Sequence, residues 1–336
     1  MNQVDRTTRL NAVKALGKYG DLRAVEHLLP LAHDVRWEVQ GAVAEALGLI
    51  GDPRALETLY EMYYRKTYQY IESDGAPHRF DAIVAGAAIG LARLYRQHEN
   101  PEIFELLVNR FHYEIAQSDD VTAACTLQGL PYTGDRRVTP LLIQASASSS
   151  AWLRYCALKA LGILADPDGL PTLYCAVREG DPLSIVSAAA DALALFRQPE
   201  ADQPLLDGWH RIETGSWSKD HLWCDSRVSI VRALGIIATP RALRFLEQLW
   251  RSHQVPLTTL GAIGLAYSGD QQVFQTLISN LSTGDWWTQA GAAAALGRLG
   301  NPDAIPALVA RLPGTETAGT NVKDAIHAAL EQLRQV

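Results

Sequence analysis

A motif of three residues returns along the chain at a nearly constant distance. A small residue, a leucine or isoleucine and a second small residue (proline in one copy) recur around Leu16, Leu47, Ile89, Leu130, Leu161, Leu193, Leu234, Leu265 and Leu296. The steps between copies are 31, 42, 41, 31, 32, 41, 31 and 31 residues. A period of 31 residues, interrupted by three insertions, indicates a repeat protein and excludes a single globular core.

Two further columns keep the register of this motif. Turn positions follow the copies at Asp21, Asp52, Asn100, Asp135, Asp166, Gln198, Thr239, Asp270 and Asn301. A leucine stands seven residues after each turn position, at Leu28, Leu59, Leu107, Leu142, Leu173, Leu205, Leu246, Leu277 and Leu308. Glycine and Asp-Pro at the turns end one helix and begin the next. Each repeat therefore predicts a helix A, a tight turn and a helix B, with the leucine column buried and no sheet.

These repeats predict one all-α solenoid, a superhelix of about ten helical hairpins, over residues 1–336. The repeats start near residues 7, 36, 79, 120, 151, 183, 224, 256 and 287, and residues 321–336 form a shorter C-terminal capping unit. The small residues of the motif leave room for neighbouring repeats to approach closely. A pair of short helices cannot hide its own apolar face, so stacking of the repeats supplies the core. We expect no separate globular domains.

Three segments of these repeats resemble a known repeat class. They are residues 45–59 (EALGLIGDPRALETL), 294–308 (AALGRLGNPDAIPAL) and 153–162 (LRYCALKALG). They are similar to the short HEAT-like repeats of the phycobilisome-lyase (E/Z) class. The resemblance implies a HEAT-type α-solenoid. Members of this class include bilin lyases and isomerases of cyanobacterial antenna proteins, and also adaptor and chaperone-like proteins, so the resemblance leaves the activity open.

Composition excludes several classes of function. The net charge is −7 and no run of basic residues occurs, so the chain lacks the electrostatic footprint of a nucleic-acid-binding protein. No apolar stretch approaches the length of about eighteen residues that spans a membrane, and no apolar leader is seen. The four cysteines form no CxxC pair and show no zinc spacing, which predicts a cytoplasmic protein without a metal site. Cys125 and Cys156 occupy one helix-A position in adjacent repeats and are predicted to be small core residues.

The first insertion, which follows helix B of the second repeat, is rich in tyrosine. Tyr60, Tyr63, Tyr64, Tyr68 and Tyr70 fall within eleven residues. Tyrosine offers a flat apolar face and a hydrogen-bonding tip, which suits a tetrapyrrole, a peptide or a protein partner. Tyr60, Tyr68 and Tyr70 are therefore candidate binding residues. The alternative is an elongated helix B whose tyrosines cover the edge between repeats.

The third insertion is rich in tryptophan and histidine. It contains Trp209, His210, Trp217, His221 and Trp223 within fifteen residues. Long loops in a regular array are often functional, so Trp209, Trp217 and Trp223 are candidate binding residues. The alternative is a packed loop that buries its own tryptophans.

A polar stripe is expected along helix B, which we place on the concave surface of the solenoid. Twelve residues past the turn positions stand Tyr64, His112, Arg178, His210 and Arg251. Such a groove contains cations that could bind carboxylates or propionates. The alternative is an ordinary solvated helix face.

Two polar residues interrupt an otherwise apolar column near the start of helix B. They are Thr139 and Asp202. A carboxylate at such a position is costly unless it is paired or exposed. Asp202 is therefore either a catalytic residue or a sign that the sixth repeat is locally loosened.

Two functions stay open at this stage, and no catalytic residue is identified. The first is a non-catalytic scaffold or adaptor, without cofactor, that binds a protein partner through the groove and the aromatic insertions. The second is a bilin lyase or lyase-isomerase, or a subunit of one, that attaches a linear tetrapyrrole to a phycobiliprotein client. In the second case Arg178, Arg251 or His210 would bind the propionates, and catalysis would consist mostly of positioning. No GxSxG, Walker, Rossmann or HExxH motif is present.

Overall fold

The computed structural model describes residues 6–64, 81–215, 221–252, 254–283, 286–314 and 320–334. Over these ranges the chain folds into 19 α-helices and ten short 3-10 helices, and no strand occurs in them. The all-α helical-hairpin fold predicted from the repeat period is confirmed. The chain divides into two compact units, Met1–Gly169 (unit 1) and Leu170–Val336 (unit 2).

Unit 1 contains alternating A and B helices. Its A helices are α1 (Arg6–Tyr19), α3 (Trp37–Ile50), α5 (Asp81–His98), α7 (Asp120–Gly129) and α9 (Ala151–Leu164). Its B helices are α2 (Val25–Leu28), α4 (Leu56–Tyr64), α6 (Pro101–Ala116) and α8 (Thr139–Ser146). The 3-10 helices are Leu22–Ala24, Leu29–His33, Pro53–Ala55, Leu130–Thr133, Arg136–Val138 and Pro167–Gly169.

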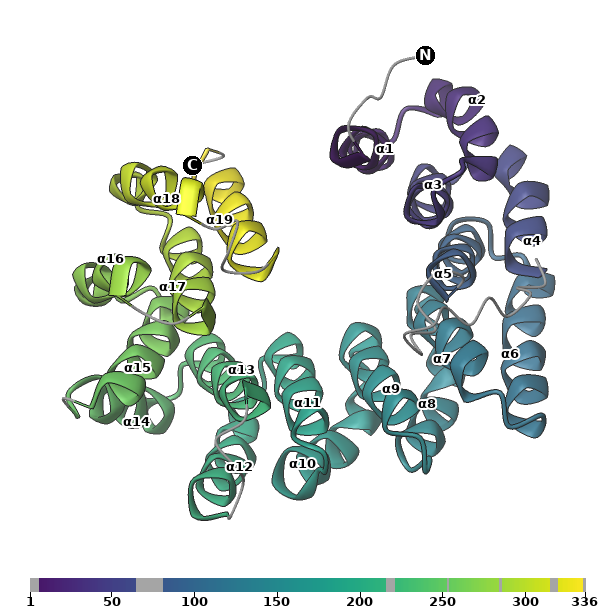
Figure 1. Cartoon of the computed structure of the whole chain (residues 1–336). Helices are drawn as coiled ribbons and strands as arrows, with labels where there is room; N and C mark the ends of the chain where they lie inside the picture. Colours follow the sequence, from purple (N-terminus) through teal and green to yellow (C-terminus); the bar gives the residue numbers. More distant parts are fainter. Residues whose placement is uncertain are drawn as a thin grey trace, which may run out of the picture. The chain divides into compact units, whose positions relative to one another are not determined.

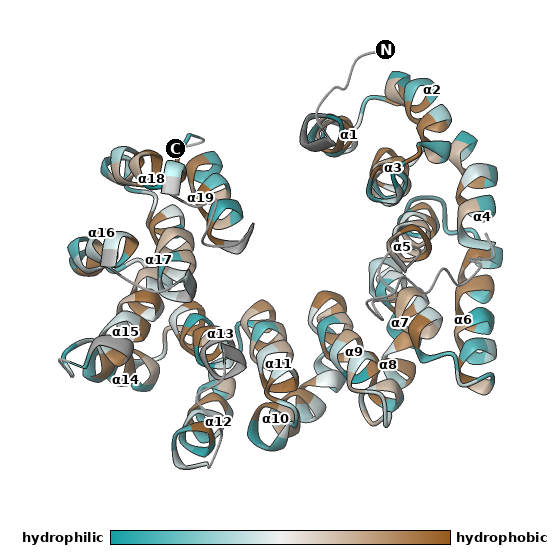
Figure 2. Cartoon of the chain, in the orientation of Figure 1, coloured by the Kyte–Doolittle hydropathy of each residue, from teal (hydrophilic) through white to brown (hydrophobic). Residues whose placement is uncertain are grey.

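Unit 2 continues the same alternation. Its A helices are α11 (Leu183–Phe196), α13 (His221–Ile237), α15 (Val255–Ser268), α17 (Trp286–Leu299) and α19 (Thr320–Leu333). Its B helices are α10 (Leu170–Glu179), α12 (Asp202–Thr214), α14 (Pro240–Trp250), α16 (Phe274–Thr283) and α18 (Ile305–Arg311). Its 3-10 helices are Pro199–Ala201, Gln271–Val273, Pro302–Ala304 and Leu312–Gly314. The helices of both units carry hydrophobic and hydrophilic residues side by side, as amphipathic helices do (Figure 2).

The A helices form the closely packed layer of each unit. A Cβ added at Gly48 of α3 would overlap the Cα of Gly90 in α5, and one added at Gly297 of α17 would lie 2.7 Å from the Cα of Ala329 in α19. Contacts between neighbouring B helices are sparser. The layer with the shorter spacing must lie on the inside of a curved stack. Within each unit taken separately, the A helices accordingly lie inside and the B helices outside (Figure 1).

The turn and leucine columns appear as predicted. Eight of the nine turn positions are N-caps of the helix that follows, and seven of these, all except Gln198, accept a backbone N–H with the side chain. The ninth, Asp166, accepts from the backbone N–H of Asp168. All nine column leucines have 0 % of their surface exposed. Each repeat thus buries its column leucine completely, in both units.

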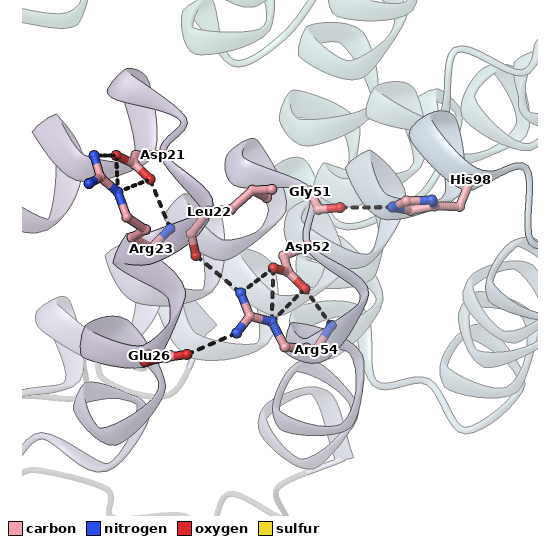
Figure 3. A network of polar contacts seen from close by, with 8 residues as sticks. All are labelled: Asp21, Leu22, Arg23, Glu26, Gly51, Asp52, Arg54 and His98. Carbon is pink, nitrogen blue, oxygen red and sulfur yellow. Dashed lines mark hydrogen bonds and ion pairs between the residues drawn. The ribbon is translucent and has the colours of Figure 1, made fainter.

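Three turns of unit 1 contain an Asp-x-Arg ion pair: Asp21–Arg23, Asp52–Arg54 and Asp135–Arg137. In the second turn, Arg54 donates from Nη2 to Asp52 at 2.6 Å, and the Asp52 carboxylate also accepts the backbone N–H of Arg54 at 2.9 Å. The same guanidinium reaches the preceding repeat, where it donates to the Leu22 carbonyl at 3.2 Å and to Glu26 at 3.1 Å (Figure 3). His98 Nε2 lies 2.8 Å from the Gly51 carbonyl oxygen. The turns therefore also connect neighbouring repeats.

The two polar residues of the helix-B column each bond to the turn of the next repeat. In unit 1, Thr139 Oγ1 donates to Asp166 at 2.6 Å. In unit 2, Thr239 Oγ1 donates to Asp202 at 2.8 Å, and Arg241 lies 3.7 Å from the same carboxylate. Both hydrogen bonds join a threonine and an aspartate. In unit 1 the threonine is on helix B and the aspartate in the turn, and in unit 2 the two residue types are exchanged. Asp202 is therefore a paired structural residue, and neither a catalytic role nor a loosened repeat is needed to explain it.

The third Asp-x-Arg turn predicts a defined acid sensitivity. Hydrogen bonds from Arg137 lower the pKa of Asp135 from 3.8 to about 2. Because the pKa is lower in the folded state, the ion pair stabilises the protein above about pH 4, and this contribution is lost as the pH falls to about 2. Asp135→Asn keeps an oxygen for the N-cap but loses the charge. Urea unfolding should show a loss of about 1 kcal/mol at pH 7, discounted for the exposed arginine, and no difference from wild type near pH 2.

The control for this prediction is Asp303→Asn. Asp303 is an exposed aspartate in the 3-10 helix before α18. Its substitution should leave the pH profile of stability unchanged. A deficit of Asp135→Asn that is as large at pH 2 as at pH 7 would contradict the predicted pH dependence.

Candidate functional site

The five predicted groove residues lie on the B layer. Tyr64 is 55 % exposed at the end of α4, and His112 is exposed on α6, both in unit 1. Arg178, His210 and Arg251 are exposed in unit 2. The expectation that helix B lines a concave surface is wrong within each unit, because the closely spaced A helices occupy the inside. Whether these five residues bind a partner stays a prediction.

The arginines of this set already have carboxylate partners. Arg178 Nε donates to Asp207 at 2.9 Å, and Arg251 lies 3.7 Å from Glu247. Asp207 also accepts from the side chain of Gln203, whose own carbonyl oxygen accepts from Arg241. A chain of polar contacts therefore joins α10, α12 and α14, which are successive B helices of unit 2. An anionic ligand would have to displace these internal partners.

The aromatic insertions are described only in part. Tyr68, Tyr70 and Trp217 lie outside the described residues, and nothing is described for the side chain of Trp223. Tyr60 is half-buried on α4, where burial raises its pKa. These residues are untested as binding residues.

Trp209 is not available to a partner. It is 0 % exposed within α12, its ring meets the Phe245 ring edge-on at 5.3 Å, and the Arg227 guanidinium lies 4.5 Å from the ring centre. Arg227 in turn donates to Glu213 at 2.5 Å. The prediction of Trp209 as an exposed binding residue is wrong, because helix α12 continues through this position and turns the indole into the core.

A buried polar cluster closes the end of α4. Arg110 of α6 donates to the Tyr63 carbonyl at 2.6 Å and to Glu114 at 2.6 Å, and its guanidinium lies 4.3 Å from the Tyr63 ring centre. Tyr63 is fully buried and its hydroxyl lies 3.1 Å from Thr126 Oγ1. Burial raises the pKa of Glu114, and Arg110 opposes that shift. This cluster ties α4, α6 and α7 together.

An aromatic pair with one exposed member lies on α9, an A helix that the prediction of a helix-B groove did not consider. Trp152 is 51 % exposed, and its ring stacks on that of Tyr155 with centroids 5.6 Å apart and an interplanar angle of 12°. Lys159 Nζ lies 5.4 Å from the centre of the Tyr155 ring. One turn further on, Ile163 is 40 % exposed. These four residues form one solvent-facing stripe on the inner side of unit 1.

The stripe extends to the neighbouring A helix. Tyr132 occupies the repeat position of Ile163, and the Arg93 guanidinium lies 4.6 Å from its ring centre. We name Tyr132, Trp152, Tyr155 and Ile163 the aromatic face. The sequence contains a pattern that predicts this surface. Positions 152, 155, 159 and 163 have helical spacing, and they lie on a different side of the helix from the buried Leu153, Cys156 and Leu161.

The described cysteine thiols are not activated. Cys125 is 1 % exposed and Cys156 is 4 % exposed, which confirms both as core residues. Burial raises the pKa of Cys156 to about 12 and also raises the pKa of the exposed Cys175, which lies beside Glu179. Among the described residues, no group of three or more His, Cys, Asp or Glu side chains could hold a metal ion. No described helix is long and apolar enough to cross a membrane.

Stacked A–B hairpins with capped turns define a class of repeat protein. The family model of HEAT repeats matches residues 1–76, 108–194 and 254–331, and the chain belongs to this family. Over part of the chain, the resemblance to the phycobilisome-lyase class is matched by one relative. Phycocyanobilin lyase subunit alpha of Picosynechococcus sp. is 30 % identical over 105 residues, which are 28 % of this chain and 39 % of that protein. The chain thus matches less than half of the length of this relative.

Solved structures with a similar arrangement include several helical repeat proteins. The complex of CpcE and CpcF of phycocyanin lyase from Nostoc sp. PCC7120 matches with a TM-score of 0.46 and 15 % identity, over 80 % of this chain and 99 % of that chain. Human deoxyhypusine hydroxylase matches with a TM-score of 0.37 and 16 % identity, over 99 % and 92 % of the two chains. Importin beta matches with a TM-score of 0.44 and 12 % identity, over 99 % and 56 % of the two chains.

Proposed function

We propose that this protein is a cytoplasmic, non-catalytic scaffold that binds another protein, and that the aromatic face of unit 1 makes the main contact. The observation that carries the proposal is the stacked Trp152–Tyr155 pair on α9, in which the Trp152 side chain is exposed and Tyr155 is partly exposed. Large rigid aromatic side chains are enriched at protein interfaces and at their energetic centres. The exposed Trp152 side chain is not explained by the packing of α9, so we assign it to the contact with a partner.

A comparison of the two layers tests this proposal. Tagged wild type, Trp152→Ser/Tyr155→Ser and Arg178→Ala/Arg251→Ala are purified from cells that express the protein natively, and bound proteins are quantified by mass spectrometry. A discrete partner should be reduced at least about tenfold in the aromatic double variant, since interface aromatics dominate binding energy. It should be retained by the arginine double variant, whose cations already have internal partners.

The opposite result would place the binding surface on the B helices. Loss of the partner in Arg178→Ala/Arg251→Ala alone would identify the outer B layer, with Tyr64, His112 and His210, as the contact surface. If no protein is enriched by the wild-type chain over an unrelated tagged control, the scaffold proposal fails.

The second candidate is a subunit of a bilin lyase or lyase-isomerase that acts on a phycobiliprotein. The similarity to a phycocyanobilin lyase subunit favours it. In this case the aromatic side chains would hold a linear tetrapyrrole, with Arg178, Arg251 or His210 at its propionates. Titration of the purified protein with phycocyanobilin should then shift and sharpen the visible absorption of the pigment. An unchanged spectrum at saturating protein would count against this function.

A further inference from the structure

The α-helices of the A layer and those of the B layer in unit 1 differ in the sign of their net charge. Its A helices contain eight Lys or Arg and four Asp or Glu residues, a net charge of +4. Its B helices contain one Arg and six Glu residues, a net charge of −5. The whole chain has a net charge of −7, so the A helices of unit 1 are locally cationic within an acidic protein. A local field of this kind selects partners of the opposite sign.

Most of the exposed charged side chains on these A helices are also positive. The exposed Lys, Arg, Asp and Glu residues described on them are Lys14, Lys18, Arg96, Lys159 and Glu45. Lys159 stands within the aromatic face, beside Tyr155. Arg93, partly exposed, covers the Tyr132 ring from the adjacent helix. The aromatic face is therefore flanked by the cations Arg93 and Lys159, while the exposed carboxylate Glu45 holds the repeat position of Lys159 on α3.

The apolar residues of this surface recur in four of the five A-helix repeats of unit 1. The position directly after the three-residue motif holds Leu49 on α3, Leu91 on α5, Tyr132 in the 3-10 helix after α7 and Ile163 on α9, whereas α1 has Lys18 there. Leu49 is 42 % and Ile163 40 % exposed, and Tyr132 is partly exposed, whereas Leu91 is buried. An added Cβ at Gly129 would lie 2.5 Å from the carbonyl carbon of Ala88, so the motifs of consecutive A helices lie side by side. These positions therefore form one row across the A helices.

The spacing of this row fits a helix better than a strand. Packed helix axes lie about 8–10 Å apart, so successive members of the row repeat at about that distance. An α-helix that crosses the A helices presents the same face every seven residues, which is about 10.5 Å. A strand covers that distance in about three residues and then presents its opposite face. Apolar side chains at i and i+7 of a helix would meet the row in register.

We infer that the inner side of unit 1 binds an acidic amphipathic helix of a partner protein, with its apolar stripe on the aromatic face and its carboxylates on the flanking cations. The inference rests on the proposed scaffold function and adds the chemistry of the partner. Helix recognition in such grooves uses apolar anchors at helical spacing. The cations speed association and exclude basic helices, and the aromatic face holds the bound helix.

Defined peptides test the inference on the full-length protein. Two fluorescent peptides of about 21 residues have leucines at the same i, i+3 and i+7 positions, and their polar positions are all Glu in one and all Lys in the other. Anisotropy titration should show the acidic peptide binding at least about tenfold more tightly than the basic one. Added salt should narrow this difference, because screening weakens exposed charge pairs.

Matched variants separate this surface from the rest of the molecule. Trp152→Ser should weaken binding of the acidic peptide at least about tenfold, whereas Tyr113→Ser, which removes an aromatic residue that is 66 % exposed on the outer helix α6, should not. Lys159→Glu should weaken the acidic peptide and strengthen the basic one, whereas Lys323→Glu on α19 should change neither. Circular dichroism confirms that each variant is folded.

The outcomes distinguish this inference from the scaffold function. Equal binding of both peptides, or an unchanged affinity in Trp152→Ser, overturns the acidic-helix inference. If the native partner is nevertheless lost in Trp152→Ser/Tyr155→Ser, the scaffold function stands with a partner of different chemistry. If the peptides bind as expected but no native protein is enriched, the surface is real and the proposed function fails.

Discussion

Replacing Leu173 with alanine should lower the free energy of unfolding by about 2–5 kcal/mol, through lost apolar transfer energy and the cavity left behind. Leu173 belongs to the leucine column and has 0 % of its surface exposed in α10. Because neighbouring repeats share each interface, the damage should spread beyond its own hairpin. Hydrogen exchange should therefore show faster exchange in α11 and α12, which both pack on α10.

Cys175→Ala is the matched control for this variant. Cys175 lies two residues further along the same helix and is exposed. Its substitution should change the unfolding free energy by no more than about 0.5 kcal/mol. A denaturation curve of Leu173→Ala that coincides with wild type would refute the view that the leucine column holds the repeats together.

A methyl group added at Gly48 should also destabilise the protein, by about 1–3 kcal/mol. Gly48 of α3 faces the backbone of Gly90 in α5, and a new Cβ there would overlap the Gly90 Cα. Backbone atoms cannot turn aside as a side chain can, so Gly48→Ala must push the two helices apart. The gain of about 1 kcal/mol in helix propensity only partly offsets this cost.

Gly291→Ala provides the comparison. This glycine also lies in an A helix, but the nearest atom to its added Cβ is the terminal Cδ1 of Ile263, at 2.7 Å. That side chain can rotate away, so the gain in helix propensity should leave the variant as stable as wild type or slightly more stable. Chemical denaturation of both variants measures the difference. Equal effects would mean that the close approach of α3 and α5 is not a stability requirement.

The candidate site was predicted less well than the fold because its residues are not set by the repeat. Tyr64, His112 and Arg178 lie on B helices, as expected, but the B layer lies outside within each unit. The small residues Gly48 and Gly90 contain the information needed, since the layer with the smallest side chains packs most closely and lies inside the curve.

The sequence by itself determined the period, the nine turns and the nine buried leucines. Each of these follows from local rules, since a cap, a helix stop and an apolar residue at a fixed offset act within one repeat or between adjacent ones. Tertiary structure alone decided which polar residues are paired and which aromatic residues are buried. Asp202 is paired because Thr239 of the next turn reaches it, and Trp209 is buried because Phe245 and Arg227 enclose it, whereas Trp152 stays in solvent. These outcomes depend on side-chain contacts between different repeats, which residue type and spacing do not specify.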